Sequence, residues 1–299
     1  MEPASELTPE LRAFVEFVAK KGRELYRDLP WRRTYDPYAI WISEVMLQQT
    51  QVSRVDGRWQ RWLERFPTVD ALAAAAPSDV LEEWQGLGYN RRALSVHRAA
   101  QAISEVGGVF PQDPKELVKL PGIGLATAAG IRAFAFNLHG VYLETNVRTV
   151  FLHELYPQAE GVPDSELVPL VELTCPASVE DAADVADAAN VANADSAAND
   201  ATAELTPRSW YYALLDYGAY LKKTIPNPSR RSKSHVKQSR FEGSHRQKRA
   251  ELLRVLLAHK DEGGAVFETL HQELCQIEVN AGRETLDEQV TLGLLEELA

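Results

Sequence analysis

Apolar residues recur along this chain with the spacing of helices. Leu11, Phe14 and Val18 would share one face of a helix, and Val80 and Trp84 would share another. The alternation that marks half-buried strands is weak, and proline, glycine and aspartate interrupt the apolar segments at short intervals. The pattern predicts an all-α domain of many short helices joined by tight turns.

Polar residues ahead of these segments predict where helices begin. Ser78 and Asp113 each precede an apolar periodic stretch. Both residue types accept backbone hydrogen bonds at a helix N-cap. We therefore expect Ser78 and Asp113 to be the caps of two helices.

A break in the pattern falls at IPNPSRRS, residues 225–232. We expect a helical domain over residues 1–225, followed by a basic linker and a small C-terminal module over residues 226–299. Within the first domain, the Ala/Asp/Asn tract of residues 177–205 has low complexity, which predicts an acidic loop.

The C-terminal module has its own helical signals. One helix is predicted near residues 246–259, a turn at Gly263 and Gly264, and a last helix near residues 285–298. These elements fit either a small helical module or a winged-helix module.

The charge of the chain is unevenly distributed. The formal net charge is −11 over 299 residues, a balance that taken alone argues against a nucleic-acid partner. However, Pro176–Glu204 holds seven acidic residues and no Lys or Arg, whereas Lys222–Arg254 holds eleven Lys or Arg and two Glu. We therefore expect a solvated acidic insertion and a basic contact surface, so the net charge does not exclude DNA.

Targeting and cysteine signals are weak. No apolar run approaches the roughly 20 residues that a membrane helix needs. The acidic, amphipathic start MEPASELTPELRAF is unlike a signal peptide. Cys175 and Cys275 are far apart and form neither a metal-ligand spacing nor a disulfide framework. We expect a cytoplasmic protein that contacts no membrane.

The string LPGIGLATAAG, residues 120–130, has the composition of a hairpin between two helices. One helix would end at Leu120, Gly122 would turn the chain, and Gly124 would let the next helix begin at once. The backbone N–H groups at such a turn can bind a DNA phosphate without reading the base sequence. The alternative is a plain corner between two packed helices.

A single carboxylate lies within the mostly apolar run WISEVMLQQTQV, residues 41–52. Glu44 is flanked by Ile42 and Val45. A carboxyl group in apolar surroundings has a raised pKa and can act as an acid near neutral pH. The alternative is a surface glutamate on an amphipathic helix.

Several of these strings together resemble a known family. LPW at 29–31, PYAIWISEVMLQQTQV at 37–52, WQGLGYNRRA at 84–93 and NVRTV at 146–150 closely resemble the MutY-type adenine DNA glycosylases, as does the hairpin between them. The resemblance covers residues 10–160, about half of the chain. It implies the all-α helix–hairpin–helix DNA glycosylase fold, with two helical lobes and a cleft.

The resemblance also implies roles for single residues. Glu44 would protonate adenine at N7 and help to position water. Gln48 matches the wedge position that fills the gap left by a flipped base, and Gln49 lies beside it. Tyr89 matches the aromatic residue inserted beside the partner base, although a core tyrosine is the alternative. From their place just after Tyr89, Arg91 and Arg92 are candidates for phosphate contacts, and the alternative is a pair of charges on a solvated helix.

One motif departs from the family pattern. Where relatives have a string similar to L-D-G-N-V, this chain has LETNV, so Glu144 stands for the aspartate and Thr145 for the glycine. The resemblance implies that Glu144 stabilises the cationic sugar and that Asn146 supports it. The longer side chain moves the charge by about one methylene, and a 1 Å misplacement can cost about a hundredfold in rate. Either the backbone compensates or the activity is reduced or retargeted.

Other family features are missing. Bifunctional relatives such as endonuclease III carry a lysine where this chain has Ala126, so strand cleavage through a Schiff base is not expected. Residues 219–239, which match the position of the family's iron–sulfur cluster, contain no cysteine, so we expect no cofactor. The basic run of residues 222–240 would clamp phosphates instead. Residues 241–299 are too short for the family's C-terminal domain, which inspects 8-oxoguanine.

The sequence thus predicts a monofunctional DNA glycosylase of base excision repair that removes adenine opposite 8-oxoguanine or guanine. Its partner would be double-stranded DNA with mismatched or oxidised base pairs, and the protein would act as a monomer. Two alternatives are a glycosylase for thymine or uracil opposite guanine, and a catalytically impaired DNA-binding lesion sensor.

Overall fold

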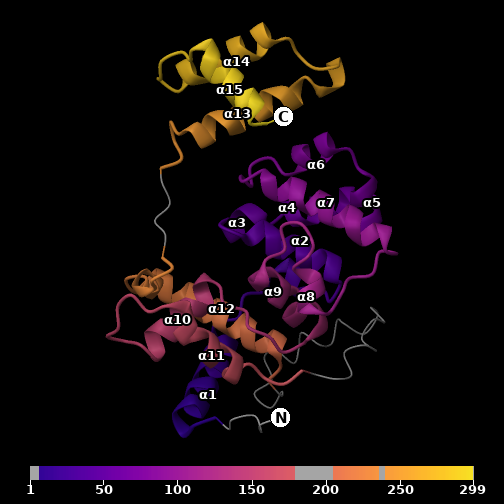
Figure 1. Cartoon of the computed structure of the whole chain (residues 1–299). Helices are drawn as coiled ribbons and strands as arrows, with labels where there is room; N and C mark the ends of the chain where they lie inside the picture. Colours follow the sequence, from indigo (N-terminus) through magenta and orange to yellow (C-terminus); the bar gives the residue numbers. More distant parts are fainter. Residues whose placement is uncertain (1–6, 179–204, 236–239, 299) are drawn as a thin grey trace.

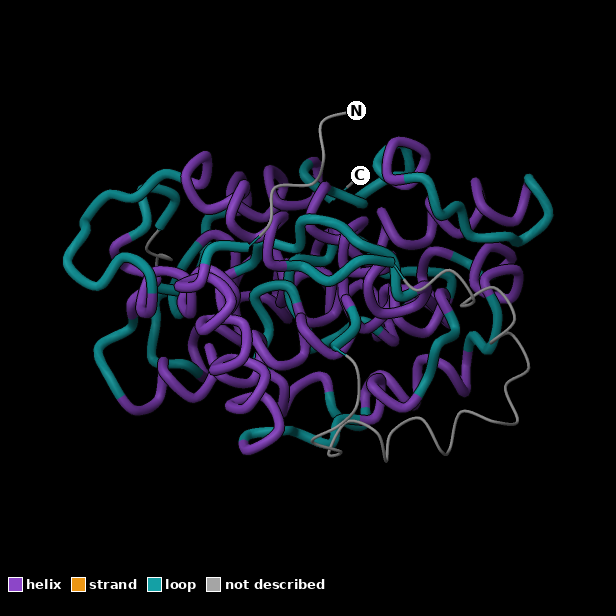
Figure 2. The backbone as a smooth tube through the Cα atoms, turned by 90° about the horizontal axis from the view of Figure 1, so that it is seen from below, coloured by secondary structure: helices purple, strands orange, loops and turns teal. Residues whose placement is uncertain are grey.

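The computed structural model describes residues 7–178, 205–235 and 240–298, and its regular structure is helical (Figures 1 and 2). Within these ranges no strand forms, and the β pairing is an isolated bridge between Val162 and Ser232. The prediction of an all-α fold is confirmed. Among the described helices, none combines the length and the apolar character that crossing a bilayer requires.

The first lobe contains most of the short helices. Its aromatic core includes Trp41, Trp62 and Trp84, and the Trp62 and Trp84 rings meet edge to face with centroids 5.5 Å apart. The elements of this lobe are η1 (Pro30–Arg33), α2 (Pro37–Leu47), α3 (Val52–Val55), α4 (Arg58–Arg65), α5 (Val69–Ala74), α6 (Pro77–Glu83), α7 (Arg91–Glu105), α8 (Pro114–Leu117) and α9 (Leu125–Phe136).

The second lobe joins the N-terminal helix to later segments of the chain. Its core includes Phe14, Phe151 and Trp210, and the Phe14 ring meets the other two edge to face at 5.1 Å and 6.1 Å. Its elements are α1 (Pro9–Glu24), α10 (Thr145–Glu154), α11 (Asp164–Thr174), α12 (Pro207–Thr224) and η5 (Pro228–Arg231).

Helices α2 and α9 pack against each other and contribute side chains to both lobes (Figure 1). On α2, Ile40 belongs to the core of the second lobe and Trp41 to the core of the first. On α9, Phe134 packs in the second lobe and Ile131 in the first. These two helices therefore form the junction between the lobes.

A buried ion pair also links the lobes. Arg32 of η1 donates two hydrogen bonds to the carboxylate of Asp216 on α12, at 2.7 and 2.8 Å. Both side chains are almost fully buried. Breaking such a pair leaves an uncompensated charge and destabilises a protein by about 3–5 kcal/mol.

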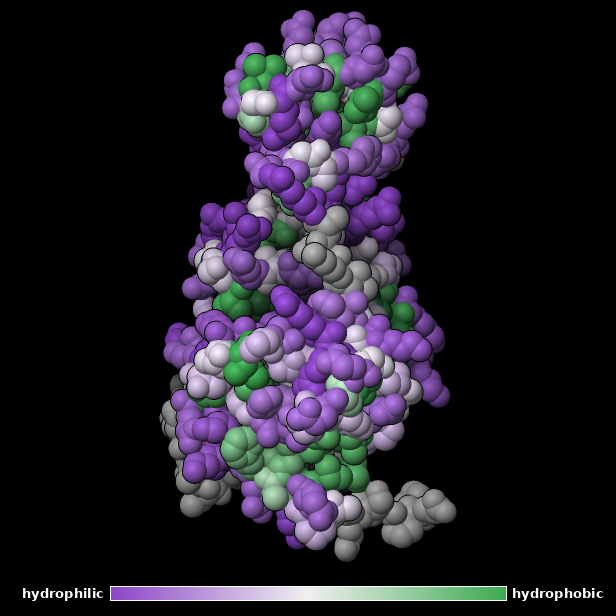
Figure 3. Space-filling model, turned by 90° about the vertical axis from the view of Figure 1, so that its left-hand side faces the viewer, coloured by the Kyte–Doolittle hydropathy of each residue, from purple (hydrophilic) through white to green (hydrophobic). Residues whose placement is uncertain are grey.

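The C-terminal module is a three-helix unit with its own small core. It contains α13 (His245–Ala258), η6 (Lys260–Glu262), α14 (Phe267–Asn280) and α15 (Glu288–Glu296). Leu252, Leu274 and Leu294 pack together at its centre, and Figure 3 shows the module as a separate knob at one end of the molecule. Residues 240–298 contain no strand that could form a wing, so the helical alternative is the one observed.

The basic linker predicted from residue 226 begins as part of the second lobe. Pro228 and Ser229 are buried against it. Arg231 donates to the carbonyl oxygen of Leu152, in the last turn of α10, at 2.7 Å and to that of Ala159, beyond the end of this helix, at 3.3 Å. Arg231 therefore stabilises the second lobe, whereas the sequence analysis predicted that it binds phosphates with the rest of residues 222–240.

The two predicted helix caps had different outcomes. Asp113 is the N-cap of α8, and its carboxylate accepts a hydrogen bond from the Lys115 amide at 2.6 Å. The prediction for Ser78 is wrong, because α6 begins at Pro77 with Ala76 as its N-cap. Proline sets the helical φ at the first position and needs no amide partner there, so it starts this helix two residues earlier than a cap at Ser78 would.

Candidate active site

Glu44 lies on the junction helix α2. The helix is fixed at its start by Asp36, whose carboxylate accepts hydrogen bonds from the amides of Tyr38 and Ala39 at 3.0 and 3.3 Å. The residues around Glu44 in the helix are almost all buried, while Glu44 itself retains partial exposure. The carboxyl group is thus surrounded by protein, on a residue that is partly exposed.

Tyr142 is the hydrogen-bond partner of Glu44. Its hydroxyl donates to Glu44 Oε2 at 2.9 Å. The ring is buried, with edge contacts to Phe134 at 5.2 Å and to Tyr211 at 5.3 Å, and its amide donates to the Tyr211 hydroxyl at 3.1 Å. Because the tyrosine is fixed on several sides, it holds one carboxyl oxygen of Glu44 in place.

Gly130 of α9 leaves the space that the Glu44 carboxyl group occupies. A Cβ atom added at Gly130 would overlap Glu44 Oε2, and it would lie 3.0 Å from Glu44 Cδ and 2.9 Å from Tyr142 Cε2. A residue with a side chain here would therefore displace the carboxyl group.

The surroundings of Glu44 favour its neutral form. Burial raises its pKa to about 8, and the negative charge of Glu144 adds to the rise, whereas the hydrogen bond from Tyr142 acts in the opposite direction. Burial disfavours a charged carboxylate, since little water remains to solvate it. Most Glu44 side chains are consequently protonated at neutral pH.

Glu144 caps the start of α10. Its Oε1 atom accepts hydrogen bonds from the amides of Asn146 at 2.6 Å and Val147 at 3.2 Å. The extra methylene relative to aspartate is thus accommodated by folding the carboxylate back onto its own helix, where N–H groups and the helix dipole favour a negative charge.

The pKa of Glu144 is raised by burial, and these amides together with the positive charge of Lys222 oppose the rise. Lys222 also donates to the Asn146 side chain at 3.1 Å. Within the described part of the chain, neither Glu44 nor Glu144 forms an ion pair. The negative charge of Glu144 thus acts on Glu44, and neither carboxyl group is held by an ion pair of its own within these residues.

The predicted wedge residues have strained backbones. Gln49 has a φ of 53° and Tyr89 a φ of 51°, in the left-handed region that residues with side chains seldom adopt. Such strain costs about 1–3 kcal/mol and clusters at functional sites. Tyr89 is 37% exposed, which rules out the alternative of a core tyrosine. Gln48 is less free, since its side chain donates to the Thr127 hydroxyl at 3.0 Å.

Arg92 has a structural role that the sequence did not reveal. Its guanidinium donates to the carbonyl oxygens of Val45 and Gln48, both at 2.7 Å, and to those of Leu87 at 3.1 Å and Gly88 at 3.0 Å. Burial lowers its pKa to about 10, so it stays charged at neutral pH. The expected phosphate contact is thus wrong for Arg92. Its hydrogen bonds instead connect the segment that carries Gln48 to the segment that precedes Tyr89.

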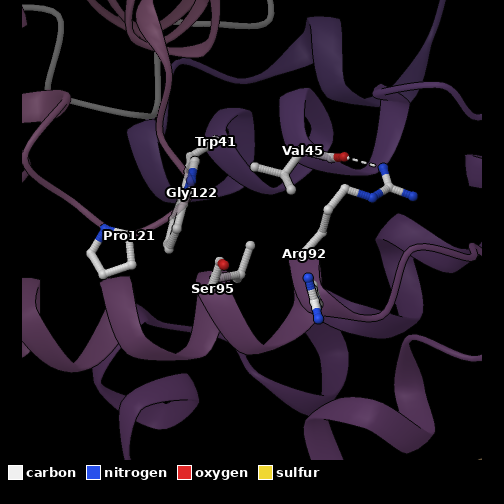
Figure 4. A pocket seen from close by; sticks show the side chains of 8 residues that line it. Trp41, Val45, Arg92, Ser95, Pro121 and Gly122 are labelled. Atoms are coloured by element: carbon white, nitrogen blue, oxygen red, sulfur yellow. Dashed lines mark hydrogen bonds between the residues drawn. The ribbon is translucent and has the colours of Figure 1, made fainter. Parts of the chain in front are cut away.

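The hairpin has the predicted turn. Gly122 has a φ of 77°, and a Cβ there would lie 2.6 Å from Ser95 Cβ, so glycine is required. Gly124 is the N-cap of α9, and a Cβ there would meet nothing within 4 Å. Arg91, at the exposed start of α7, lines a small pocket with Gly122, shown in Figure 4 together with the hydrogen bond between Val45 and Arg92.

The cysteines do not fit an iron–sulfur cluster. Cys175 is buried in the core of the second lobe, and Cys275 belongs to the C-terminal module, where it contacts His271 at 3.7 Å. A cluster needs four ligands close together.

The fold and this pair of carboxyl groups define a class of DNA repair protein. Residues 42–208 match the model of the HhH-GPD superfamily of base excision DNA repair proteins, and the chain belongs to this superfamily.

Curated relatives make the likeness more specific. The chain is 46% identical over 136 residues to the adenine DNA glycosylase of Mycolicibacterium smegmatis, covering 45% of this chain and 46% of that protein. It is 39% identical over 134 residues to the adenine DNA glycosylase of Homo sapiens, covering 42% of this chain and 24% of that protein. The matches span less than half of these relatives, and the family resemblance read from the sequence is confirmed.

Solved structures share the fold. A thermostable thymine-DNA glycosylase superposes with a TM-score of 0.57 at 20% identity, covering 73% of this chain and 90% of that chain. A trapped endonuclease III–DNA covalent intermediate superposes with a TM-score of 0.51 at 17% identity, covering 74% and 94%.

Proposed function

We propose that this protein is a monofunctional DNA glycosylase that hydrolyses the N-glycosidic bond of adenine opposite 8-oxoguanine or guanine. The observation that carries the proposal is the pairing of Glu44, neutral at pH 7, with a second carboxyl group that acts on it from the start of α10. The identity to adenine DNA glycosylases over the same residues supports adenine as the base.

Glu44 is the proposed acid. Adenine is a poor leaving group until it is protonated, and a neutral carboxyl group at Glu44 can donate that proton to N7. The bond to the sugar then breaks with its electron pair going to the base. The hydrogen bond from Tyr142 stabilises the carboxylate that proton transfer leaves behind, and this carboxylate can accept a proton from the attacking water.

Glu144 is the proposed stabiliser of the cationic sugar. Its two amide donors and the positive charge of Lys222 favour the ionised form despite burial. A fixed negative charge stabilises a transition state in which positive charge develops, provided that it is already in place. Asn146 supports this arrangement by contributing an amide donor to Glu144 and binding Lys222 through its side chain.

The remaining site residues serve DNA binding in this proposal. Gln48, Gln49 and Tyr89 would fill the gap left by the extruded nucleotide. The amides at Gly122 and Gly124 would hold a backbone phosphate, and the open space around Gly124 supports a close approach.

Ala126 provides no amine for a Schiff base, which supports hydrolysis without strand cleavage. We further propose that the protein acts on double-stranded DNA as a monomer and needs no cofactor.

The test uses purified protein and four duplexes that carry A opposite 8-oxoguanine, A opposite G, T opposite G, and U opposite G. Alkali then cleaves the abasic sites. Product from the first two duplexes alone supports the proposal. Product from thymine or uracil indicates a glycosylase of other specificity, and binding without product indicates a lesion sensor.

The Glu44→Gln variant keeps the shape of the acid but cannot donate the same proton. We expect at least a hundredfold loss of base release, with DNA affinity retained in a gel-shift assay. Unchanged turnover would refute the assigned role of Glu44.

A further inference from the structure

The C-terminal module contacts the wedge of the first lobe. Arg246, near the start of α13, donates through Nη1 to the Tyr89 hydroxyl at 3.3 Å. The guanidinium carbon lies 5.6 Å from the centre of the Tyr89 ring and 5.3 Å from that of Phe241. One arginine thus joins an aromatic residue of the module to the strained aromatic residue of the first lobe.

The same stack continues into the first lobe. Arg92 lies 5.4 Å from the Tyr89 ring and 5.3 Å from the ring of the buried Trp84. Two guanidinium groups therefore alternate with three aromatic rings, from Trp84 through Tyr89 to Phe241. Each cation–π contact contributes about 0.5–1 kcal/mol at an exposed site and more where water is excluded.

A second contact fixes the opposite end of α13. Lys260, just beyond the helix, pairs with Asp79 at 3.2 Å and with Glu82 at 2.6 Å, both on α6. Arg65 of the first lobe pairs with the same two acids at 3.1 and 3.0 Å. Because both ends of α13 touch the first lobe, the helix lies beside the wedge in a defined position.

The charge at this place is unusual for the chain. The first turn of α13 carries no acidic residue, and its first five positions include Arg246, Lys248 and Arg249, in a protein with a net charge of −11. Lys248 pairs with Glu278 at 3.9 Å and Arg249 with Glu297 at 3.0 Å inside the module. Two aromatic side chains remain exposed here, Phe241 at 50% and Tyr89 at 37%. Exposed aromatic rings interleaved with basic side chains form surfaces that bind nucleic acid.

We infer that Phe241 and Arg246 form, together with Tyr89, a contact surface for duplex DNA that extends the wedge onto the C-terminal module. Arg246 would bind a backbone phosphate next to the wedge, since a guanidinium carries five N–H donors in a planar arrangement that matches phosphate oxygens. Lys260 would hold the module in the position that this contact needs. The inference rests on the proposed function only in taking DNA as the substrate.

The experiment measures the affinity of the full chain for a fluorescent duplex at several salt concentrations. Arg246→Gln should weaken binding about tenfold and reduce the slope of log affinity against log salt by about 1, since one phosphate contact is lost. Arg254→Gln is the matched control, because Arg254 lies on the same helix and pairs with Glu251. Equal affinities and slopes for the two variants would overturn the inference.

A charge exchange tests the docking of the module. Lys260→Glu should weaken DNA binding, and combining it with Glu82→Lys should restore at least part of the loss. DNA binding that is unaffected by Lys260→Glu would contradict the inference. Circular dichroism and thermal melting verify that each variant is folded.

The two proposals fail separately. Binding that depends on Arg246, without release of adenine, would sustain the contact surface and refute the glycosylase. Release of adenine with binding independent of Arg246 would sustain the glycosylase and refute the contact surface.

Discussion

The hydroxyl of Tyr142 donates a hydrogen bond to Oε2 of Glu44 at 2.9 Å, across 98 residues of sequence. It fixes the Oε2 oxygen of the carboxyl group. It also favours the charged form of Glu44, against the burial that raises its pKa to about 8. The strength of the proposed acid therefore depends on a residue from the other lobe.

This relationship predicts a pH dependence. Glu44 must be protonated to act, so single-turnover base release should be constant below the pKa and fall as the pH rises through about 8. Tyr142→Phe removes a donor to the carboxylate, which destabilises the charged form and raises the pKa. The alkaline limb of the rate profile should move to higher pH, and the plateau should fall about tenfold, the equivalent of 1.4 kcal/mol.

Tyr217→Phe is the control for this measurement. Tyr217 is also a buried tyrosine of the second lobe, but its hydroxyl donates to Glu154. The control should leave the alkaline limb in place. An identical limb in wild type and Tyr142→Phe would contradict the assigned role of Tyr142.

Gly130→Ala should disturb the acid directly. The added methyl group would overlap Glu44 Oε2 and approach Tyr142, so the carboxyl group has to move. We expect a loss of base release of at least tenfold, with stability reduced by about 1–3 kcal/mol from overpacking. Single-turnover kinetics and thermal melting separate the two effects, and activity equal to wild type would show that the carboxyl group is not confined as described.

Two substitutions of Glu144 should distinguish the effect of its negative charge from the effect of its hydrogen bonds as the N-cap of α10. Glu144→Gln retains an oxygen for the amides of Asn146 and Val147 but removes the charge, so base release should fall about a hundredfold with little change in melting temperature. Glu144→Ala also removes the cap and should cost about 0.5–2 kcal/mol of stability. Equal base release from wild type and Glu144→Gln would show that the negative charge plays no part.

Replacing Arg92 should make the segments that carry Gln48 and Tyr89 more mobile while leaving the Glu44 carboxyl group unchanged. Lysine retains the charge but cannot reach the four carbonyl oxygens of Val45, Gln48, Leu87 and Gly88 together. Arg92→Lys should lower the melting temperature and weaken DNA binding several-fold, whereas Arg91→Lys, at an exposed position, should preserve stability. Hydrogen exchange at residues 48–50 would detect the loosening, and equal protection in the two variants would refute this role.

The sequence predicted the helices well because helical packing leaves a local mark. The buried Phe14 and Val18 of α1, and Val80 beside Trp84, are the residues that the apolar spacing identified. Helix α14 was missed although Leu270, Leu274 and Ile277 have helical spacing. A search of the module for that spacing would have found it.

The site was only partly visible from the sequence. Glu44 and Glu144 were singled out by motif, and the negative charge of Glu144 contributes to the raised pKa of Glu44. The role of Tyr142 arises from a contact 98 positions away, and that of Arg92 depends on contacts with Val45 and Gln48, 47 and 44 positions away, which no local pattern records. The position of the Glu144 carboxylate could likewise not be predicted, because it depends on how the longer side chain folds back onto α10.

Helices α2 and α9 form the junction between the two lobes, with side chains in the cores of both. The acid, and the glycine that makes room for it, are therefore assembled only when both lobes have folded. A chain with one lobe still unfolded would lack the organised Glu44 carboxyl group, so the proposed reactivity toward DNA is tied to completion of the fold.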